Sequence, residues 1–191
     1  MAAIAPRSAA VSGATVSKTA LLVIDVQSAL VASADQGSDV VAVIRRLIER
    51  ARGSGTPVIY LQHCHATYQP MMKGAAGWHI HADVAPEPGE MVIEKTASDA
   101  FYQTSLQTEL ERLAVERLII CGLQTEFCVD TTCRAAFSRG FEVVLAADAH
   151  TTTDAVMSAR IVVQHHNHAL ANLAHPQRRI AVAPSAEVDV E

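Results

Sequence analysis

The sequence lacks the features of several protein classes. No apolar run approaches the length that a membrane-spanning helix needs. The formal net charge is −5 and no basic cluster offsets it, which argues against a nucleic-acid-binding protein. The first 18 residues have no charged segment followed by an apolar core, so they do not indicate a secretory signal. We therefore expect a cytoplasmic protein that binds neither nucleic acid nor a membrane.

The cysteines argue against two kinds of structural site. The four thiols form no CxxC pair and no recognisable zinc-binding spacing. A chain of 191 residues is long enough to bury a hydrophobic core, so it does not need a disulfide framework. We predict one domain over residues 19–185, with a loose N-terminal arm (1–18) and a C-terminal tail (186–191).

Short apolar runs alternate with amphipathic segments along this domain. The runs predict strands over residues 20–25, 57–63, 91–95, 117–123 and 141–149, with a weak sixth over 178–183. Helical spacing follows over residues 38–55, 105–116 and 153–174, and another helix ends at Arg139. Such alternation is typical of βαβ units. The sequence therefore predicts an α/β fold, a three-layer αβα sandwich with a mostly parallel, Rossmann-like sheet of about six strands.

Three chemically active side chains follow predicted strands. Asp25 ends the first strand, Lys95 ends the third, and Cys128 opens the helix after the fourth. Ligands bind beyond the carboxyl ends of parallel strands, so the three side chains are candidates for one site. A buried carboxylate needs a partner, which Lys95 can supply. A helix N-terminus should lower the pKa of Cys128, and N–H groups of the same turn can hold an oxyanion.

Together these groups are the parts of an acyl-transfer site, but each also has a structural interpretation. Cys128 can be a packed core thiol, Asp25 a turn cap and Lys95 a solvated surface residue. Spacing alone leaves both interpretations open.

Three segments carry a resemblance to a known family. "LLVIDVQ", "VIEKTASDAF" and "CGLQTEFCVDTTCRAAFSRGFEVVLAADAHTT" together resemble the isochorismatase-like cysteine hydrolases, which include nicotinamidases and other small-amide hydrolases. The resemblance covers about residues 19–172. It implies a catalytic triad of Asp25, Lys95 and Cys128. It also implies a cis peptide after Leu123 that directs the N–H groups of Gln124 and Cys128 toward one oxyanion.

The resemblance implies a hydrolase that cleaves the C–N bond of a small amide or imide through a thioester, without a cofactor. Homodimers or homotetramers are usual among such proteins, so we expect a homo-oligomer. Relatives that act on isochorismate generally lack the cysteine, which favours C–N hydrolysis here. An isochorismatase-type hydrolase, a metal-assisted nicotinamidase-like amidase and a non-hydrolytic thiol sensor or scaffold remain alternatives.

The segment after the second predicted strand differs from that of nicotinamidases, which bind a metal there through an aspartate and histidines. Here it reads "LQHCHATYQP", without an aspartate. His63 and His65 remain as possible ligands, but alternate residues leaving a strand tend to face opposite ways. We predict no metal.

The region of residues 65–90 breaks the alternating pattern, which suggests a substrate lid or an oligomer contact. Its "GAAGWHIHADVAPEPGE" is similar to a segment of the streptothricin hydrolase-like subgroup, and Trp78 within it either walls the pocket or packs at a dimer interface. Phe101 and Tyr102 follow Lys95 closely enough to line the same cavity. Gln27 either offers its amide to the substrate or caps a loop. We predict these four residues, Gln27, Trp78, Phe101 and Tyr102, as substrate-binding.

Overall fold

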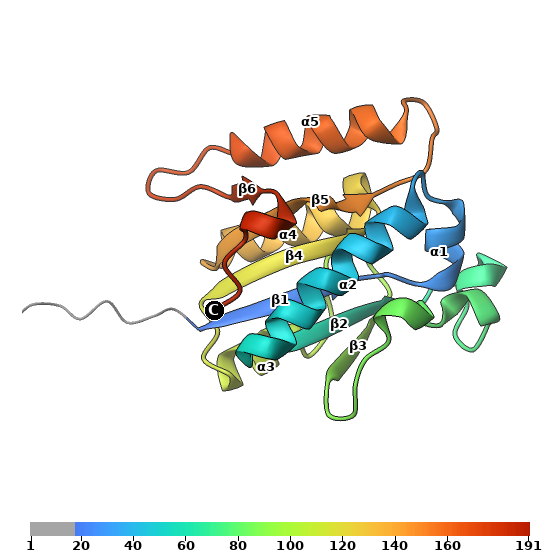
Figure 1. The fold of residues 1–191 in the computed structure, drawn as a ribbon, viewed down its shortest axis with the longest axis horizontal. Coiled ribbons are helices and arrows are strands. Elements are labelled where there is room, and N and C mark those ends of the chain that lie inside the picture. The colour runs from blue at the N-terminus through green and yellow to red at the C-terminus, as the bar shows by residue number, and fades with distance from the viewer. Residues whose placement is uncertain (1–17) are drawn as a thin grey trace, which may run out of the picture.

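Six parallel strands form one sheet in the computed structural model, which describes residues 18–191 (Figure 1). Their order across the sheet is β3-β2-β1-β4-β5-β6, and every neighbouring pair is parallel. The strands are β1 (Thr19–Ile24), β2 (Val58–His63), β3 (Met91–Lys95), β4 (Arg117–Leu123), β5 (Glu142–Thr151) and β6 (Ala181–Ala183). The predicted α/β class and parallel sheet are confirmed.

Helices cover both faces of the sheet. They are α1 (Ser28–Ser33), α2 (Gly37–Ser54), α3 (Leu106–Arg112), α4 (Asp130–Ser138) and α5 (Ala159–Ala171). The apolar stripe of α2 packs with α1 against one face, and α3 and α4 pack against the other. Figure 1 shows α2 crossing the near face of the sheet and α4 behind it. No helix within residues 18–191 is both long and apolar enough to cross a membrane.

Three helices differ from the sequence-based expectation, and the smallest difference is that α3 ends at Arg112 rather than at residue 116. Helix α1 was not predicted, and α5 begins at Ala159 rather than at residue 153. The Asp154 carboxylate accepts a hydrogen bond from the Ala159 N–H at 2.7 Å, so it caps the helix from five residues upstream. Residues 153–158 therefore form the entry to the helix and not its first turns.

The C-terminal residues 186–191 pack against the sheet instead of leaving it as a tail. Val188 and Val190 are only 2% and 7% exposed. The Arg50 guanidinium, from α2, donates to the carbonyl oxygens of Ser185, at 2.7 Å, and Val188. These contacts fix the end of the chain over the α2 face. The predicted arm, apart from Lys18, lies outside the described residues.

The strand order reverses between β1 and β4, and the ends of these strands come unusually close together. Gly122, near the end of β4, has a φ of +127°, and a Cβ atom there would lie 2.0 Å from the carbonyl oxygen of Ile24. Only glycine allows this approach. The reversal places the residues after Ile24 beside those after Leu123, where parallel α/β sheets bind ligands.

Candidate active site

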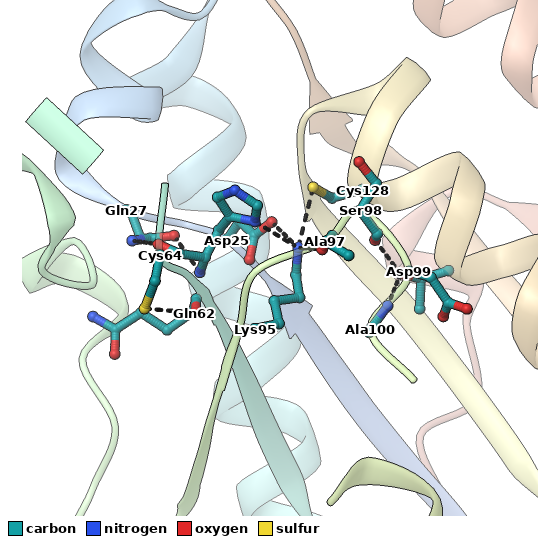
Figure 2. A network of polar contacts seen from close by, with 12 residues as sticks. Asp25, Gln27, Gln62, Cys64, Lys95, Ala97, Ser98, Asp99, Ala100 and Cys128 are labelled. Atoms are coloured by element: carbon teal, nitrogen blue, oxygen red, sulfur yellow. Dashed lines mark hydrogen bonds and ion pairs between the residues drawn. The ribbon is translucent and has the colours of Figure 1, made fainter. Parts of the chain in front are cut away.

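Asp25, Lys95 and Cys128 meet at this edge of the sheet (Figure 2). The Lys95 ammonium lies 2.7 Å from Asp25 Oδ2 and donates to Cys128 Sγ at 3.1 Å. It also donates to the carbonyl oxygen of Ala97 at 3.0 Å. Lys95 ends β3 and pairs in register with His63 of β2, so its side chain reaches past β2 toward the end of β1. The structure brings together the three side chains that the sequence singled out.

The Lys95 side chain is fully buried, as is that of Asp25. Burial alone lowers the pKa of the ammonium, but the neighbouring Asp25 carboxylate and Cys128 outweigh it and raise the pKa above its usual value. Lys95 is therefore a fixed positive charge. It compensates the buried carboxylate and contacts the sulfur at the same time.

The expectation that the pKa of Cys128 is lowered is wrong. Burial, and then the negative charge of Asp25, raise the pKa of this thiol to about 12, although Lys95 acts in the opposite direction. Cys128 is 8% exposed, and it lies in a π-helical turn (Thr125–Val129) that precedes α4. Desolvation is the largest cause of this shift in pKa. The free protein thus holds a protonated thiol beside a carboxylate.

The π-helical turn is joined to β4 by a cis peptide bond between Leu123 and Gln124. The carbonyl oxygen of Gln124 accepts from the Val129 N–H at 3.2 Å, which closes the turn. Within residues 18–191, the Gln124 N–H donates no hydrogen bond to another backbone group. The segment that carries Cys128 therefore has at least one unused backbone donor, on a residue that lines the same cavity.

A cavity of about 520 Å³ opens over the thiol and the carboxylate. Its lining consists of Asp25, Leu30, Ser33, His63, His65, Tyr68, Met71, Ser98, Gln124, Phe127, Cys128 and Thr153. Sequence reasoning missed Tyr68 and Phe127, which are 51% and 52% exposed. Phe127 is adjacent to Cys128 in the sequence, and that adjacency was the available signal. Tyr68 belongs to a segment without periodicity, which gave no signal for it.

The four residues predicted to bind substrate are not among those that line this cavity. The Gln27 amide donates to the carbonyl oxygens of His63 (3.0 Å) and Trp78 (2.6 Å) and accepts from the His63 N–H (2.9 Å). Gln27 is fully buried, so it caps the loop, the second of its two predicted roles. The Trp78 indole N–H lies 3.3 Å from Cys64 Sγ.

Phe101 and Tyr102 also lie elsewhere. Phe101 is buried in the core and stacks on Phe141, with 6.0 Å between the ring centroids. The Arg139 guanidinium covers the same ring at 4.5 Å from its centroid. Tyr102 is 52% exposed. Closeness to Lys95 along the chain did not bring either ring into the cavity, although Ser98 does line it.

One group of side chains has the composition of a metal site. Ligand atoms of Asp25, His63 and Cys128 lie within 4.8 Å of one another. However, Lys95 Nζ contacts all three residues. It lies 3.4 Å from His63 Nδ1, 2.7 Å from Asp25 Oδ2 and 3.1 Å from Cys128 Sγ. A divalent ion among these atoms would be repelled by the ammonium at short range. These residues do not fit a metal.

His65 does not join this group. Its Nδ1 accepts hydrogen bonds from the N–H groups of Thr67 (3.2 Å) and Tyr68 (2.8 Å), so this nitrogen is occupied by its own loop. Its ring centroid lies 6.0 Å from that of His63, and both rings line the cavity. Both histidines therefore face the cavity, although alternate residues were expected to face opposite ways.

Comparisons with known proteins place this arrangement in a family. The family model described as the isochorismatase domain matches residues 19–186. The chain is 40% identical over 138 residues to a streptothricin hydrolase of Streptomyces noursei, covering 71% of this chain but only 50% of that protein, so it spans about half the length of this relative. It is 31% identical over 150 residues to nicotinamidase 3 of Arabidopsis thaliana, covering 70% of this chain and 73% of that protein. The solved structure of an isochorismatase from Pseudomonas putida superposes with a TM-score of 0.82 at 30% identity, covering 90% of each chain. This chain belongs to the isochorismatase family.

Proposed function

We propose that the protein is a cysteine hydrolase that cleaves the C–N bond of a small amide or imide through a thioester on Cys128. One observation carries the proposal. The Lys95 ammonium contacts both the Asp25 carboxylate and the Cys128 sulfur, and the latter two residues line a cavity. A carboxylate next to a thiol supplies a base and a nucleophile, and the ammonium stabilises the negative charge that moves between them.

The first half of the reaction forms the thioester. Because the Cys128 pKa is about 12, the thiol is not ionised in advance, and its proton must move to Asp25 as the sulfur attacks the carbonyl carbon. The N–H groups of Gln124 and Cys128 receive the oxyanion in this scheme. The tetrahedral intermediate then collapses, the C–N bond breaks, and Asp25 returns the proton to the leaving nitrogen.

The second half of the reaction releases the acid. The Asp25 carboxylate takes a proton from water, and the hydroxide equivalent attacks the thioester carbonyl. The C–S bond breaks, and the departing sulfur regains a proton from Asp25. Lys95 remains protonated throughout, and its contact with Cys128 Sγ stabilises the thiolate as it leaves.

The lining of the cavity supports an uncharged substrate. Among the described residues that form it there is no lysine or arginine, and Asp25 is its one carboxylate. Two exposed aromatic rings, Tyr68 and Phe127, suit a planar group. Isochorismate, a dicarboxylate, would find no lysine or arginine in this lining, and the buried Lys95 ammonium is already paired with Asp25. A thiol sensor would have no need of the buried ion pair beside Cys128.

The test is hydrolysis of a panel that includes nicotinamide, streptothricin, simple cyclic imides and isochorismate. Mass spectrometry follows each compound and its hydrolysed product, because a ring-opened imide frees no ammonia and isochorismate contains no nitrogen. Wild-type protein is assayed before and after exhaustive chelation. The proposal expects turnover of at least one C–N compound at a rate that chelation does not change. Turnover of isochorismate alone would contradict it. Activity lost on chelation and restored by a divalent metal would support the nicotinamidase-like alternative instead.

A further inference from the structure

His150 connects the π-helical turn to helix α5. It lies near the end of β5, and its imidazole is 2% exposed. Its Nδ1 lies 2.9 Å from Thr125 Oγ1, and its Nε2 lies 2.9 Å from Asn167 Oδ1. Thr125 is the first residue of the turn and Asn167 belongs to α5. Both ring nitrogens therefore have one polar partner each.

The surrounding groups fix where the protons lie in this chain of contacts. The carbonyl oxygen of Ala147 can only accept, and Asn167 Nδ2 donates to it at 3.0 Å. The amide oxygen of Asn167 must therefore face His150, so His150 Nε2 carries a hydrogen. Burial lowers the pKa of His150 to about 4, which leaves the ring neutral and Nδ1 free to accept. The hydroxyl of Thr125 is then the donor to His150 Nδ1. The three hydrogen bonds therefore run in one direction, from Thr125 to His150, from His150 to Asn167 and from Asn167 to the Ala147 carbonyl oxygen.

We propose that His150 and Asn167 are positioning residues that hold the π-helical turn, through the Thr125 hydroxyl, where Cys128 reaches Asp25 and Lys95. Thr125 is 1% exposed, so water cannot easily replace a lost partner. It also directly follows Gln124, whose N–H is the proposed oxyanion donor. A shift at Thr125 moves both the sulfur and this donor. Only the kinetic part of the test below rests on the proposed function.

The test compares Thr125→Val, which keeps the shape but removes the hydroxyl, with Thr125→Ser, which keeps the hydroxyl. Both are made with Cys64→Ser, because the other two thiols, Cys121 and Cys133, are fully buried. The rate of Cys128 alkylation by iodoacetamide is followed against pH by mass spectrometry, together with kcat, KM and Tm.

In Thr125→Val the sulfur leaves the surroundings that raise its pKa. The midpoint of alkylation should fall by about one pH unit or more. The kcat for the amide identified should fall about tenfold or more, with KM little changed. Thr125→Ser should resemble the parent in both. A second pair, His150→Leu and His150→Asn, repeats the comparison if Thr125→Val does not fold, since asparagine can place an amide oxygen near the Nδ1 position.

A lowered Tm in Thr125→Val with an unchanged alkylation midpoint and unchanged kcat would overturn the inference, because the contact would then be merely structural. Equal behaviour of the serine and valine variants would overturn it too. If the wild-type protein hydrolyses no amide, the proposed function fails, and the alkylation midpoint still decides the role of His150.

Discussion

The Lys95 ammonium and the Asp25 carboxylate form an ion pair 2.7 Å apart, and neither side chain is exposed to solvent. A buried pair of this kind stabilises a fold little by comparison with an apolar pair, but each partner is costly to leave alone. The pair contacts a thiol, and both Asp25 and Cys128 line a cavity, which indicates a chemical use. Stability and activity should therefore depend on the same two side chains.

Replacement of Lys95 by methionine should destabilise the protein and abolish turnover. Methionine leaves the Asp25 carboxylate buried without a counter-charge, and the expected loss is about 3–5 kcal/mol in the free energy of unfolding. Urea denaturation at pH 7.5 measures it. The matched control is Lys73→Met, which removes a pair with Glu94 whose side chains are 65% and 43% exposed, and it should behave like wild type. A Lys95→Met protein as stable as wild type would contradict the account of the ion pair.

Asp25→Asn should make Cys128 a worse catalyst and a more reactive thiol. Loss of the carboxylate removes a negative charge that raises the pKa of Cys128, while the Lys95 ammonium remains to stabilise the thiolate. The pKa of the thiol should fall by about one unit or more. Iodoacetamide should then modify Cys128 faster at pH 8, while amide turnover disappears. Slower alkylation together with retained turnover would show that Asp25 is not the base.

Stability should decrease in acid because of His150. The folded-state pKa of His150 is about 4, whereas an unfolded histidine titrates near 6.5, so the unfolded chain binds more protons between these values. The contribution of this residue is complete above pH 6.5, and about 3 kcal/mol is lost as the pH falls to 4.

Urea unfolding of wild type and His150→Asn at pH 4.5, 5.5, 6.5 and 7.5 measures this difference. The slope of stability against pH should be smaller in the variant. His165→Asn, on the exposed side of α5, is the matched control and should keep the wild-type slope. Equal slopes in all three proteins would show that His150 titrates normally.

Gly122→Ala should disturb the meeting point of β1 and β4. The added Cβ would lie 2.0 Å from the Ile24 carbonyl oxygen, at a φ of +127°. The backbone conformation alone should cost about 1–3 kcal/mol, and the clash adds to it. Thermal denaturation measures the loss. In α2, Gly53→Ala meets no atom within 4 Å and should stabilise the helix by about 1 kcal/mol. A neutral Gly122→Ala would mean that the strand ends can separate without cost.

The fold and the three central side chains could be predicted because their signals are local. Apolar runs that end in Asp25 and Lys95, and a turn that presents Cys128, show both the strands and their functional ends. The pKa of Cys128 could not be predicted in the same way, since it depends on how deeply other segments bury the sulfur. The side chain of Tyr68 reaches the cavity from a region without periodicity. The contact between Thr125 and His150 joins the turn after β4 to the end of β5, which no local pattern indicates.

The role of Cys128 as nucleophile is tested most directly by the kcat of Cys128→Ala on the amide or imide that the wild-type protein hydrolyses. Cys133→Ala is the matched control, because Cys133 is buried in α4 and does not line the cavity. The account predicts a loss of about a thousandfold or more in Cys128→Ala and near-wild-type kcat in Cys133→Ala. A Cys128→Ala protein that retains the wild-type kcat would show that no thioester forms on this residue.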